Sequence, residues 1–413
     1  MTRLRIAMVS EHASPLAMLG GVDAGGQNTH VAELATALAR HGHEVRVYTR
    51  RDSKDAPETV PFTEGVVVEH VPAGPPRVLP KDELLPYMGE FGRWLAARWD
   101  KGFVPDVVHA HFWMSGLAAL TATAATRIPV VVTFHALGTV KRRHQGNKDT
   151  SPDKRIGLER ELGLLADRVI AQGAEEVEEL GRMGVPRASI VVIPSRVNTD
   201  LFAPTGPTAE RPPADRRRIL SVGRLVERKG FADLIQALRR VPDAELVIAG
   251  GPPADQLDRD PEVTRLRALA ERLRVADRVR LLGSVPREDM PAWYRSADVV
   301  ACAPWYEPFG LTPLEAMACG VPVVAYAVGG LAESVIDGVT GTLVQPRDER
   351  GLAVALRQIL SDEVLRMSYA SAAVDRVQSR YTWDRAAADV ARVYAAVTGL
   401  GRVEDPALSE VSS

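Results

Sequence analysis

The stretch that decides the fold is Trp305-Tyr-Glu-Pro-Phe-Gly-Leu-Thr-Pro-Leu-Glu-Ala-Met-Ala-Cys-Gly320. An apolar run, Val299–Cys302, comes just before it, and residues 312–318 have a helical pattern. A buried strand that leads into a helix is the repeating unit of a parallel sheet covered by helices. Ligands of such sheets bind at the carboxyl ends of the strands, so Glu307 and Glu315, with seven residues between them, are candidate binding residues.

The same alternation of short apolar runs and amphipathic stretches continues in both directions along the chain. The runs that we expect to form strands are Leu4–Val9, Glu44–Thr49, Val66–Val71, Asp106–Ala110, Pro129–Phe134, Arg168–Ala171, Ile190–Ile193, Arg218–Val222, Glu245–Ala249, Val279–Leu282, Val299–Cys302, Pro322–Ala325 and Gly341–Val344. Asn28–Arg40 is the clearest helix, because its apolar residues fall on one face. Four prolines within residues 204–213 exclude a helix interior or a central strand there. We therefore expect an α/β protein in which two doubly wound, Rossmann-like domains face each other across a cleft and are joined at about residues 195–215.

The composition is that of a globular chain and excludes several classes of protein. The 413 residues include 51 Lys and Arg against 53 Asp and Glu, and the net charge of −2 lacks the basic footprint of a dedicated nucleic-acid binder. The two cysteines, Cys302 and Cys319, are too few for a disulfide framework, which favours a reducing compartment. The sequence shows neither a run of about 20 apolar residues nor a signal-peptide pattern. We expect a cytoplasmic protein without a transmembrane segment; peripheral membrane contact and the oligomeric state stay open.

Two loops contain groups that suit a phosphate. The first, residues 10–28, is rich in glycine, and Gly25 and Gly26 let backbone N–H groups approach an anion at a helix N-terminus. It fits neither the Rossmann nor the Walker pattern, and a flexible turn is the alternative interpretation. The second contains Arg224 and Lys229, two cations that suit a diphosphate, with a solvated basic pair as the alternative.

The region around the two glutamates suits hydroxyl groups and phosphate. Glu307 stands at a strand exit, where its carboxylate can bind sugar hydroxyls. The amides of residues 309–312 open a helix and can hold phosphate oxygens. Glu315, one turn into the helix, can accept two hydroxyls of a ribose. The alternative interpretation is that Glu307 caps the helix and that Glu315 is solvated.

Three other patterns give weaker indications of a metal or an anion. Asp258-Arg-Asp260 has the spacing of a divalent-metal pair, but it lies in a polar loop and is interpreted as a solvated connection. His109 and His111 share one face of a strand and can bind zinc, yet no third ligand is apparent, so a structural or cleft-lining role is expected. The cluster Lys141-Arg-Arg-His144 is too short for nucleic acid, and contact with an acidic acceptor is favoured. No metal site is predicted.

Taken together and in this order, the motifs resemble those of the retaining glycosyltransferases of family 4, which have the GT-B fold. The resemblance covers nearly the whole chain. The motifs that carry it are Gly25-Gly-Gln-Asn28, Thr133-Phe-His135, Gly223-Arg-Leu225 with Lys229-Gly230, the element from Glu307 to Glu315, Val328-Gly-Gly-Leu-Ala-Glu333 and Tyr381-Thr-Trp-Asp-Arg385. The implied domains are an acceptor-side domain (1–198), a nucleotide-sugar domain (199–378), a helix that crosses back to the first domain (379–400) and a disordered tail (401–413).

The resemblance implies transfer of a sugar from a nucleotide diphosphate, most simply UDP, with retention of configuration and without a metal or another cofactor. The leaving phosphate would take the proton of the acceptor. The implied catalytic residues are His135, Arg224, Lys229 and Glu307. The implied donor-binding residues are Gly25, Gly26, Arg224, Lys229, Glu307, Phe309, Gly310, Leu311, Thr312 and Glu315. The implied acceptor-binding residues are Asn28, Lys81, Lys141 and Arg155.

Within the family, the loop Asp23-Ala-Gly-Gly-Gln-Asn28 is similar to that of the mycothiol-pathway transferases, which act on inositol phosphate. The subgroup of sucrose-phosphate synthases is also similar. Phe112 and Ala136 stand where the mycothiol transferases have a tyrosine and a threonine, so two hydroxyls that can bind an acceptor phosphate are missing. The expected acceptor is a small polyol, a sugar phosphate or a natural-product core.

Two functions of other classes stay open. A nucleotide-sugar epimerase of similar architecture would form product from the donor without an acceptor. A non-catalytic sugar-nucleotide sensor would not need the full set of implied catalytic residues. A phosphorylase would need a pyridoxal-binding lysine, for which the sequence gives no context.

Overall fold

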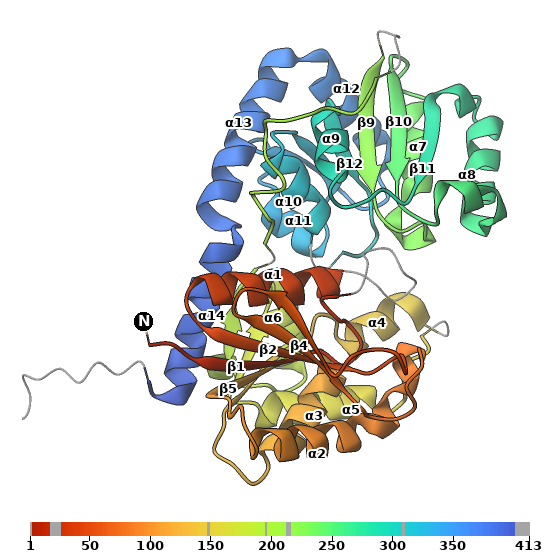
Figure 1. Cartoon of the computed structure of the whole chain (residues 1–413). Coiled ribbons are helices and arrows are strands. Elements are labelled where there is room, and N and C mark those ends of the chain that lie inside the picture. Colours follow the sequence, from red (N-terminus) through yellow and green to blue (C-terminus); the bar gives the residue numbers. More distant parts are fainter. Residues whose placement is uncertain are drawn as a thin grey trace, which may run out of the picture. The chain divides into compact units, whose positions relative to one another are not determined.

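The protein is described by a computed structural model over residues 2–16, 26–146, 149–194, 196–211, 216–307 and 310–400. The chain divides into two compact units (Figure 1). Unit 1 consists of Met1–Ala17, Gln27–Ile193 and Asp384–Ser413, and unit 2 consists of Met18–Gly26 and Pro194–Trp383. Within the described ranges, no helix combines the length and the apolar character that a bilayer span requires.

Unit 1 is built on an eight-stranded sheet with the strand order β3-β4-β2-β1-β5-β6-β7-β8. Its strands are β1 (Arg5–Val9), β2 (Glu44–Arg50), β3 (Thr59–Thr63), β4 (Val66–Val71), β5 (Val107–His111), β6 (Val130–Thr133), β7 (Arg168–Ala171) and β8 (Ile190–Val192). Its helices are α1 (Gly26–Arg40), α2 (Met88–Trp99), α3 (Trp113–Thr123), α4 (Gly138–Gln145), α5 (Arg155–Leu165), α6 (Ala174–Arg182) and, from Asp384 onward, α14 (Trp383–Thr398). In Figure 1, α2, α3 and α5 lie together on one side of the sheet and α1 lies on the other. Because both faces are covered, the central strands are almost wholly buried; β1 and β6 are mainly apolar, whereas β5 also buries His109 and His111.

Unit 2 is built on a six-stranded parallel sheet with the order β11-β10-β9-β12-β13-β14. Its strands are β9 (Arg217–Val222), β10 (Ala244–Ala249), β11 (Val279–Gly283), β12 (Val299–Cys302), β13 (Val323–Tyr326) and β14 (Gly341–Val344). Its helices are α7 (Phe231–Leu238), α8 (Pro261–Arg272), α9 (Met290–Arg295), α10 (Leu311–Ala318), α11 (Gly329–Ser334), α12 (Glu349–Ser361) and α13 (Glu363–Arg380). Every strand expected from the sequence forms in the two sheets, with ends that differ by at most one residue.

One strand, β3, was not expected from the sequence. Its residues, Thr59-Val-Pro-Phe-Thr63, alternate between exposed and half-buried, so they form no apolar run. The strand lies at the edge of the sheet. Proline has no backbone N–H to donate to a neighbouring strand, and an edge strand tolerates this loss at Pro61. It pairs antiparallel with β4 through a tight connection at Gly65, whose φ is 77°. The sheet of unit 1 is therefore not entirely parallel.

In each sheet, the strand order runs outward in both directions from one strand, β1 in unit 1 and β9 in unit 2. The candidate site lies next to these strands. β1 pairs with β2 on one side and with β5 on the other, and β9 pairs with β10 and with β12. In doubly wound sheets, the loops that follow such a strand diverge and leave room for a ligand at the carboxyl edge. The loops after β1 and β9 are therefore where ligand-binding groups are expected.

The core of unit 2 fixes the helix that follows β12. One buried cluster, which includes Phe231 and Leu234, fills one face of the sheet beneath α7, α8 and α12. A second cluster, which includes Leu314 and Met317 of α10, fills the opposite face together with α9, α11 and α13. Packing on this face holds α10 in place, and with it the carboxylate of Glu315.

Candidate functional site

The loop after β9 holds Lys229 at the carboxyl edge of the unit 2 sheet. The loop ends in a short 3-10 helix, Glu227–Lys229, and then Gly230, whose φ is 69°. A Cβ atom at Gly230 would lie 1.8 Å from the carbonyl oxygen of Ala303, directly after β12. Only glycine permits this approach, which brings the loop after β9 against the loop after β12.

Lys229 and Glu307 form an ion pair across these two loops. The distance between Lys229 Nζ and Glu307 Oε2 is 2.5 Å. Their side chains are 18% and 14% exposed, so both can be reached by a ligand. An ammonium group has three N–H donors, so one bond to Glu307 leaves two for other acceptors. Arg224 stands on the same loop, two residues after the end of β9.

Glu315 of α10 is held by two donors from neighbouring segments of unit 2. Its Oε2 accepts a hydrogen bond of 2.8 Å from the hydroxyl of Tyr294, and its Oε1 accepts one of 3.1 Å from Arg287. Burial, together with the nearby carboxylate, raises the pKa of the Tyr294 phenol well above its ordinary value. The phenol therefore stays protonated and keeps donating, which fixes the orientation of the carboxylate.

The N-terminus of α10 presents backbone amides. Gly310 precedes the helix with a φ of 65°, and a Cβ atom there would lie 2.9 Å from the carbonyl oxygen of Gly330. The first N–H groups of a helix, here those of Leu311 and Thr312, have no acceptor within the helix and favour an anion. This arrangement agrees with the role that the sequence analysis gave these residues, which stays a prediction.

Two of the predicted donor-binding residues, Gly25 and Phe309, lie outside the described residues. Gly26, the other glycine of the first loop, is the first residue of α1. The predicted role of these three residues stays a prediction.

Three buried histidines lie at the carboxyl edge of the unit 1 sheet. His109 and His111 are on β5, and His135 follows β6 with a φ of 60°. The Nδ1 atom of His111 lies 3.0 Å from the Nε2 atom of His135, and the two rings are stacked. The two ring nitrogens of His109 contact the hydroxyls of Tyr394 and Thr133, at 2.7 and 2.9 Å.

Burial keeps these three imidazoles uncharged. It lowers the pKa of His109 to about 3 and the pKa values of His111 and His135 well below the ordinary histidine value, and the neighbouring imidazoles add to this effect. At neutral pH, His135 therefore offers a hydrogen bond to a ligand rather than a positive charge.

The loop after β1 contains a polar pair that the sequence analysis missed. The Glu11 side chain is fully buried and accepts a hydrogen bond from the Ser115 hydroxyl. Its Oε1 lies 2.7 Å from Nδ1 of His12, whose side chain is 10% exposed. A buried carboxylate thus orients an accessible imidazole. The signal was present in the sequence: Glu11 and His12 stand two and three residues after the first apolar run, at the end of the strand where ligands bind.

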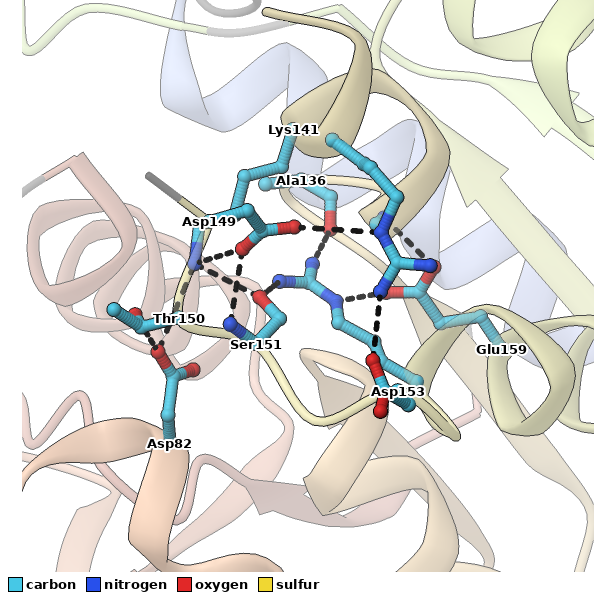
Figure 2. Close-up of polar contacts among 11 residues, drawn as sticks. Asp82, Ala136, Lys141, Asp149, Thr150, Ser151, Asp153 and Glu159 are labelled. Atoms are coloured by element: carbon cyan, nitrogen blue, oxygen red, sulfur yellow. Dashed lines mark hydrogen bonds and ion pairs between the residues drawn. The ribbon is translucent and has the colours of Figure 1, made fainter. Parts of the chain in front are cut away.

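The predicted acceptor residues Lys141 and Arg155 share one hydrogen-bonded cluster around Ser151, in which Figure 2 labels Lys141, Ser151 and Glu159. Lys141 Nζ lies 3.0 Å from Asp149 Oδ1 and donates to the Ser151 hydroxyl at 2.8 Å. Burial alone would raise the pKa of Asp149, but hydrogen bonds from Ser151 and Lys141 outweigh it and lower the pKa to about 2. Arg155 donates to the same Ser151 hydroxyl, and also to Glu159 Oε1 at 2.6 Å. The positive charges of this cluster are therefore balanced by carboxylates.

Of the other two predicted acceptor residues, Lys81 lies close to Arg155, whereas Asn28 contacts a different segment. The Lys81 ammonium and the Arg155 guanidinium lie 5.7 and 5.1 Å from the centre of the Phe112 ring. Lys81 and Arg155 thus meet at one aromatic ring. Asn28, on α1, donates to the carbonyl oxygen of Ser14 at 3.0 Å. The structure brings Lys81, Lys141 and Arg155 together, whereas Asn28 on α1 is bonded to the loop after β1.

The weaker sequence patterns have structural partners. Asp260 caps α8 by accepting from the amides of Glu262 and Val263, and Asp258 Oδ1 lies 2.5 Å from Arg267. Within the basic cluster after His135, Arg143 donates to Glu179 at 2.8 Å. The positions of Asp258, Asp260 and Arg143 are thus accounted for by contacts within the protein, and no bound metal or anion is needed to explain them.

The Arg155–Glu159 pair gives a testable prediction on stability. Both side chains are almost fully buried, at 2% and 0% exposed. We expect Arg155→Ala to lower the free energy of unfolding by about 3–5 kcal/mol, because it leaves the Glu159 carboxylate buried without its cation. Urea unfolding measures this change. Arg142→Ala, which removes a half-exposed partner of Asp149, is the control and is expected to cost under about 1 kcal/mol. Equal losses in the two variants would contradict the prediction.

Comparison with known proteins covers both units. Residues 24–201 match the family described as "Glycosyltransferase Family 4", and residues 206–376 match "Glycosyl transferases group 1". The chain is 39% identical over 410 residues to the D-inositol 3-phosphate glycosyltransferase of Xylanimonas cellulosilytica, covering 95% of this chain and 97% of that protein. It is 37% identical over 381 residues to the protein of the same name from Mycolicibacterium smegmatis, covering 90% and 87%.

Solved structures show the same architecture. Sucrose-phosphate synthase from Thermosynechococcus elongatus superposes with a TM-score of 0.85 at 31% identity, over 96% of this chain and 100% of that one. Anabaena HepE, solved with UDP and glucose, superposes with a TM-score of 0.71 at 21% identity, over 95% and 100%. Two Rossmann-like domains of the GT-B type, as the sequence analysis expected, are confirmed by these likenesses.

Proposed function

The chain belongs to the family 4 and group 1 glycosyltransferases, and on that premise we propose that it moves a hexosyl or N-acetylhexosaminyl group from a UDP-sugar to a hydroxyl of a small polar acceptor. The observation that carries the proposal is the Lys229–Glu307 ion pair at the carboxyl edge of the unit 2 sheet. It puts a cation suited to a diphosphate within one hydrogen bond of a carboxylate suited to sugar hydroxyls. The names of the relatives support a polyol or its phosphate as the acceptor.

In the proposed donor complex, each charged residue of unit 2 has one task. Lys229 and Arg224 bind the diphosphate and stabilise the negative charge that grows as it leaves. Glu307 accepts hydrogen bonds from the hydroxyls of the sugar. Glu315, which Tyr294 and Arg287 hold in place, accepts the two hydroxyls of the ribose.

The proposed reaction retains the configuration at the anomeric carbon. The acceptor hydroxyl attacks from the face that the diphosphate leaves, the new C–O bond forms as the old one breaks, and the hydroxyl proton passes to a leaving phosphate oxygen. No separate general base is required. His135, which is neutral, positions the sugar and the acceptor by a hydrogen bond. We propose that fixed cations and amides replace a divalent metal in this step.

The proposal is tested by nucleotide release from UDP-, GDP- and ADP-sugars, with and without polyols, polyol phosphates and sugar phosphates as acceptors. We expect release from one donor, stimulated by one acceptor and unchanged by EDTA. Loss of activity in EDTA would contradict a metal-independent reaction. Conversion of the donor into an isomer without any acceptor would identify an epimerase. Binding of a nucleotide sugar with no turnover under any condition would identify a sensor.

The hydroxyl of Tyr294 gives a prediction on donor affinity. We expect Tyr294→Phe to raise the KM for the donor about 3- to 10-fold with kcat little changed, because it removes one hydrogen bond that orients Glu315 in ground and transition states alike. Steady-state kinetics measure both constants. Tyr326→Phe is the matched control, since that hydroxyl donates to Asp233 instead. A fall in kcat at constant KM would overturn the assignment of Glu315 to the ribose.

A further inference from the structure

The histidines of unit 1 offer a third imidazole that the sequence did not indicate. The spacing of His109 and His111 allows the two to bind zinc, but without an apparent third ligand a structural or cleft-lining role is expected. In the structure, the nitrogens of His109 are engaged by the hydroxyls of Tyr394 and Thr133. His111 instead contacts His135, and a third imidazole, His30 of α1, lies next to both.

The three side chains His30, His111 and His135, here called the histidine cluster, have the geometry of a three-nitrogen metal site. One ring nitrogen from each lies within 4.8 Å of the others. The closest pair known, His111 Nδ1 and His135 Nε2, is separated by 3.0 Å. Two nitrogens bound to one tetrahedral zinc ion, with bonds of about 2.0–2.1 Å, stand about 3.3 Å apart. The cluster therefore reaches coordination geometry through side-chain shifts of about 1 Å or less.

An ion can bind to three neutral imidazoles without the release of a proton if each ring turns an unprotonated nitrogen toward it. In the His111–His135 contact, one ring donates an N–H to the lone pair of the other. If the donating ring changes to the tautomer with its proton on the other nitrogen, the two facing nitrogens, His111 Nδ1 and His135 Nε2, both have lone pairs available for an ion. For His111 that other nitrogen, Nε2, is buried without a hydrogen-bond partner in the described part of the chain. Moving the proton there gives up the hydrogen bond between the two imidazoles, whose two facing nitrogens then bind the ion instead.

The third imidazole is oriented from outside the cluster. The side-chain nitrogen of Gln172, which follows β7 and is 6% exposed, lies 3.2 Å from Nδ1 of His30. Ligand histidines in metal sites commonly have their second nitrogen held in this way by a polar group. In the flipped amide orientation, the oxygen of Gln172 takes the place of its side-chain nitrogen, accepts the Nδ1–H of His30 and leaves Nε2 as the ligand.

We propose that the histidine cluster binds one zinc-type divalent transition metal ion, and that this ion inhibits sugar transfer because it occupies the imidazole of His135. Three neutral nitrogen ligands suit Zn²⁺, Co²⁺, Ni²⁺ or Cu²⁺ and disfavour Mg²⁺ and Ca²⁺, which prefer oxygen. The fourth position of the ion stays open to water or a ligand hydroxyl. The inhibition rests on the proposed function, whereas the binding does not.

Binding is tested on the full chain without a polyhistidine tag, freed of metal and titrated with Co²⁺. We expect the visible absorption of a tetrahedral Co²⁺ with nitrogen ligands, saturating at one ion per chain and removed by an equivalent of Zn²⁺. His30→Gln and His111→Gln are expected to weaken binding at least tenfold. His41→Gln, which changes an exposed histidine at the end of α1, is the control and is expected to bind as before. No tetrahedral spectrum, or one that persists in His30→Gln, would overturn the site.

Inhibition is tested separately by adding Zn²⁺ to the transfer reaction. We expect at least tenfold loss of rate in the unchanged chain and in His41→Gln. His30→Gln is expected to keep its rate in Zn²⁺, since this residue has no place in the proposed reaction. Co²⁺ binding to the cluster with full activity retained in Zn²⁺ would overturn the inhibition and leave the site. Absence of any transferase activity would contradict the proposed function, while the Co²⁺ titration would still decide the site.

Discussion

Lys229→Ala is expected to lower kcat for sugar transfer about 100- to 1000-fold. The reason is that the leaving diphosphate gains negative charge as the glycosidic bond breaks, and Lys229 is a fixed cation at the place where that charge develops. Gly230 and its contact with Ala303 preset the position of the loop, so no rearrangement is needed at the moment of reaction. The side chain is only 18% exposed, which limits screening by water. Nucleotide release in the presence of the acceptor measures the effect.

The control for this experiment is Lys101→Ala, which removes an exposed lysine of unit 1 and is expected to leave kcat unchanged. Thermal unfolding of both variants shows whether the fold is intact. Glu307→Gln keeps the cation and removes the carboxylate, so it is expected to raise the KM for the donor as well as to lower kcat. A loss of less than tenfold in Lys229→Ala, in a folded chain, would show that Lys229 does not stabilise the leaving group.

Acid is expected to destabilise unit 1 steeply through His109, His111 and His135. Their pKa values are lowered in the folded chain, to about 3 for His109, from an ordinary value of 6.5. The unfolded chain therefore binds protons more readily than the folded chain. The stabilisation is complete above about pH 6.5 and is lost as the pH falls toward 3. Three such groups make the free energy of unfolding fall by up to about 4 kcal/mol per pH unit below pH 6.

Urea unfolding at a series of pH values between neutrality and the acid transition measures this slope. His109→Gln is expected to reduce the slope by about 1.4 kcal/mol per pH unit, the share of one proton. Val131→Ala, a buried residue of β6 without an ionisable group, is expected to lower stability without changing the slope. If the slope of His109→Gln matched that of the unchanged chain, His109 would not be the source of the acid sensitivity.

The strands were predictable because most of their residues are buried and apolar, so that nearly every strand contains a short apolar run. β3 was not, since an edge strand with Pro61 and half-exposed side chains has no such run. Gly230 and Gly310 stood within motifs that the sequence analysis quoted, but their positive φ angles and close contacts required the structure.

The site was predictable only as separate segments. Lys229 and Glu307 are 78 positions apart, and their ion pair depends on β9 and β12 being neighbours in the sheet. The pairing of His111 with His135 rather than His109 depends in the same way on β5 lying beside β6. Spacing along the chain identifies residues on one strand, whereas contacts between strands follow from the order of the sheet.

The helix that contains Tyr394 has a consequence for how the protein is made. Unit 1 takes most of its residues from Gln27–Ile193 but also needs α14, whose Tyr394 is fully buried against His109. During synthesis, residues Pro194–Trp383 of unit 2 leave the ribosome between these two segments. Unit 1 begins to be translated first, yet its folding cannot end until α14 has emerged.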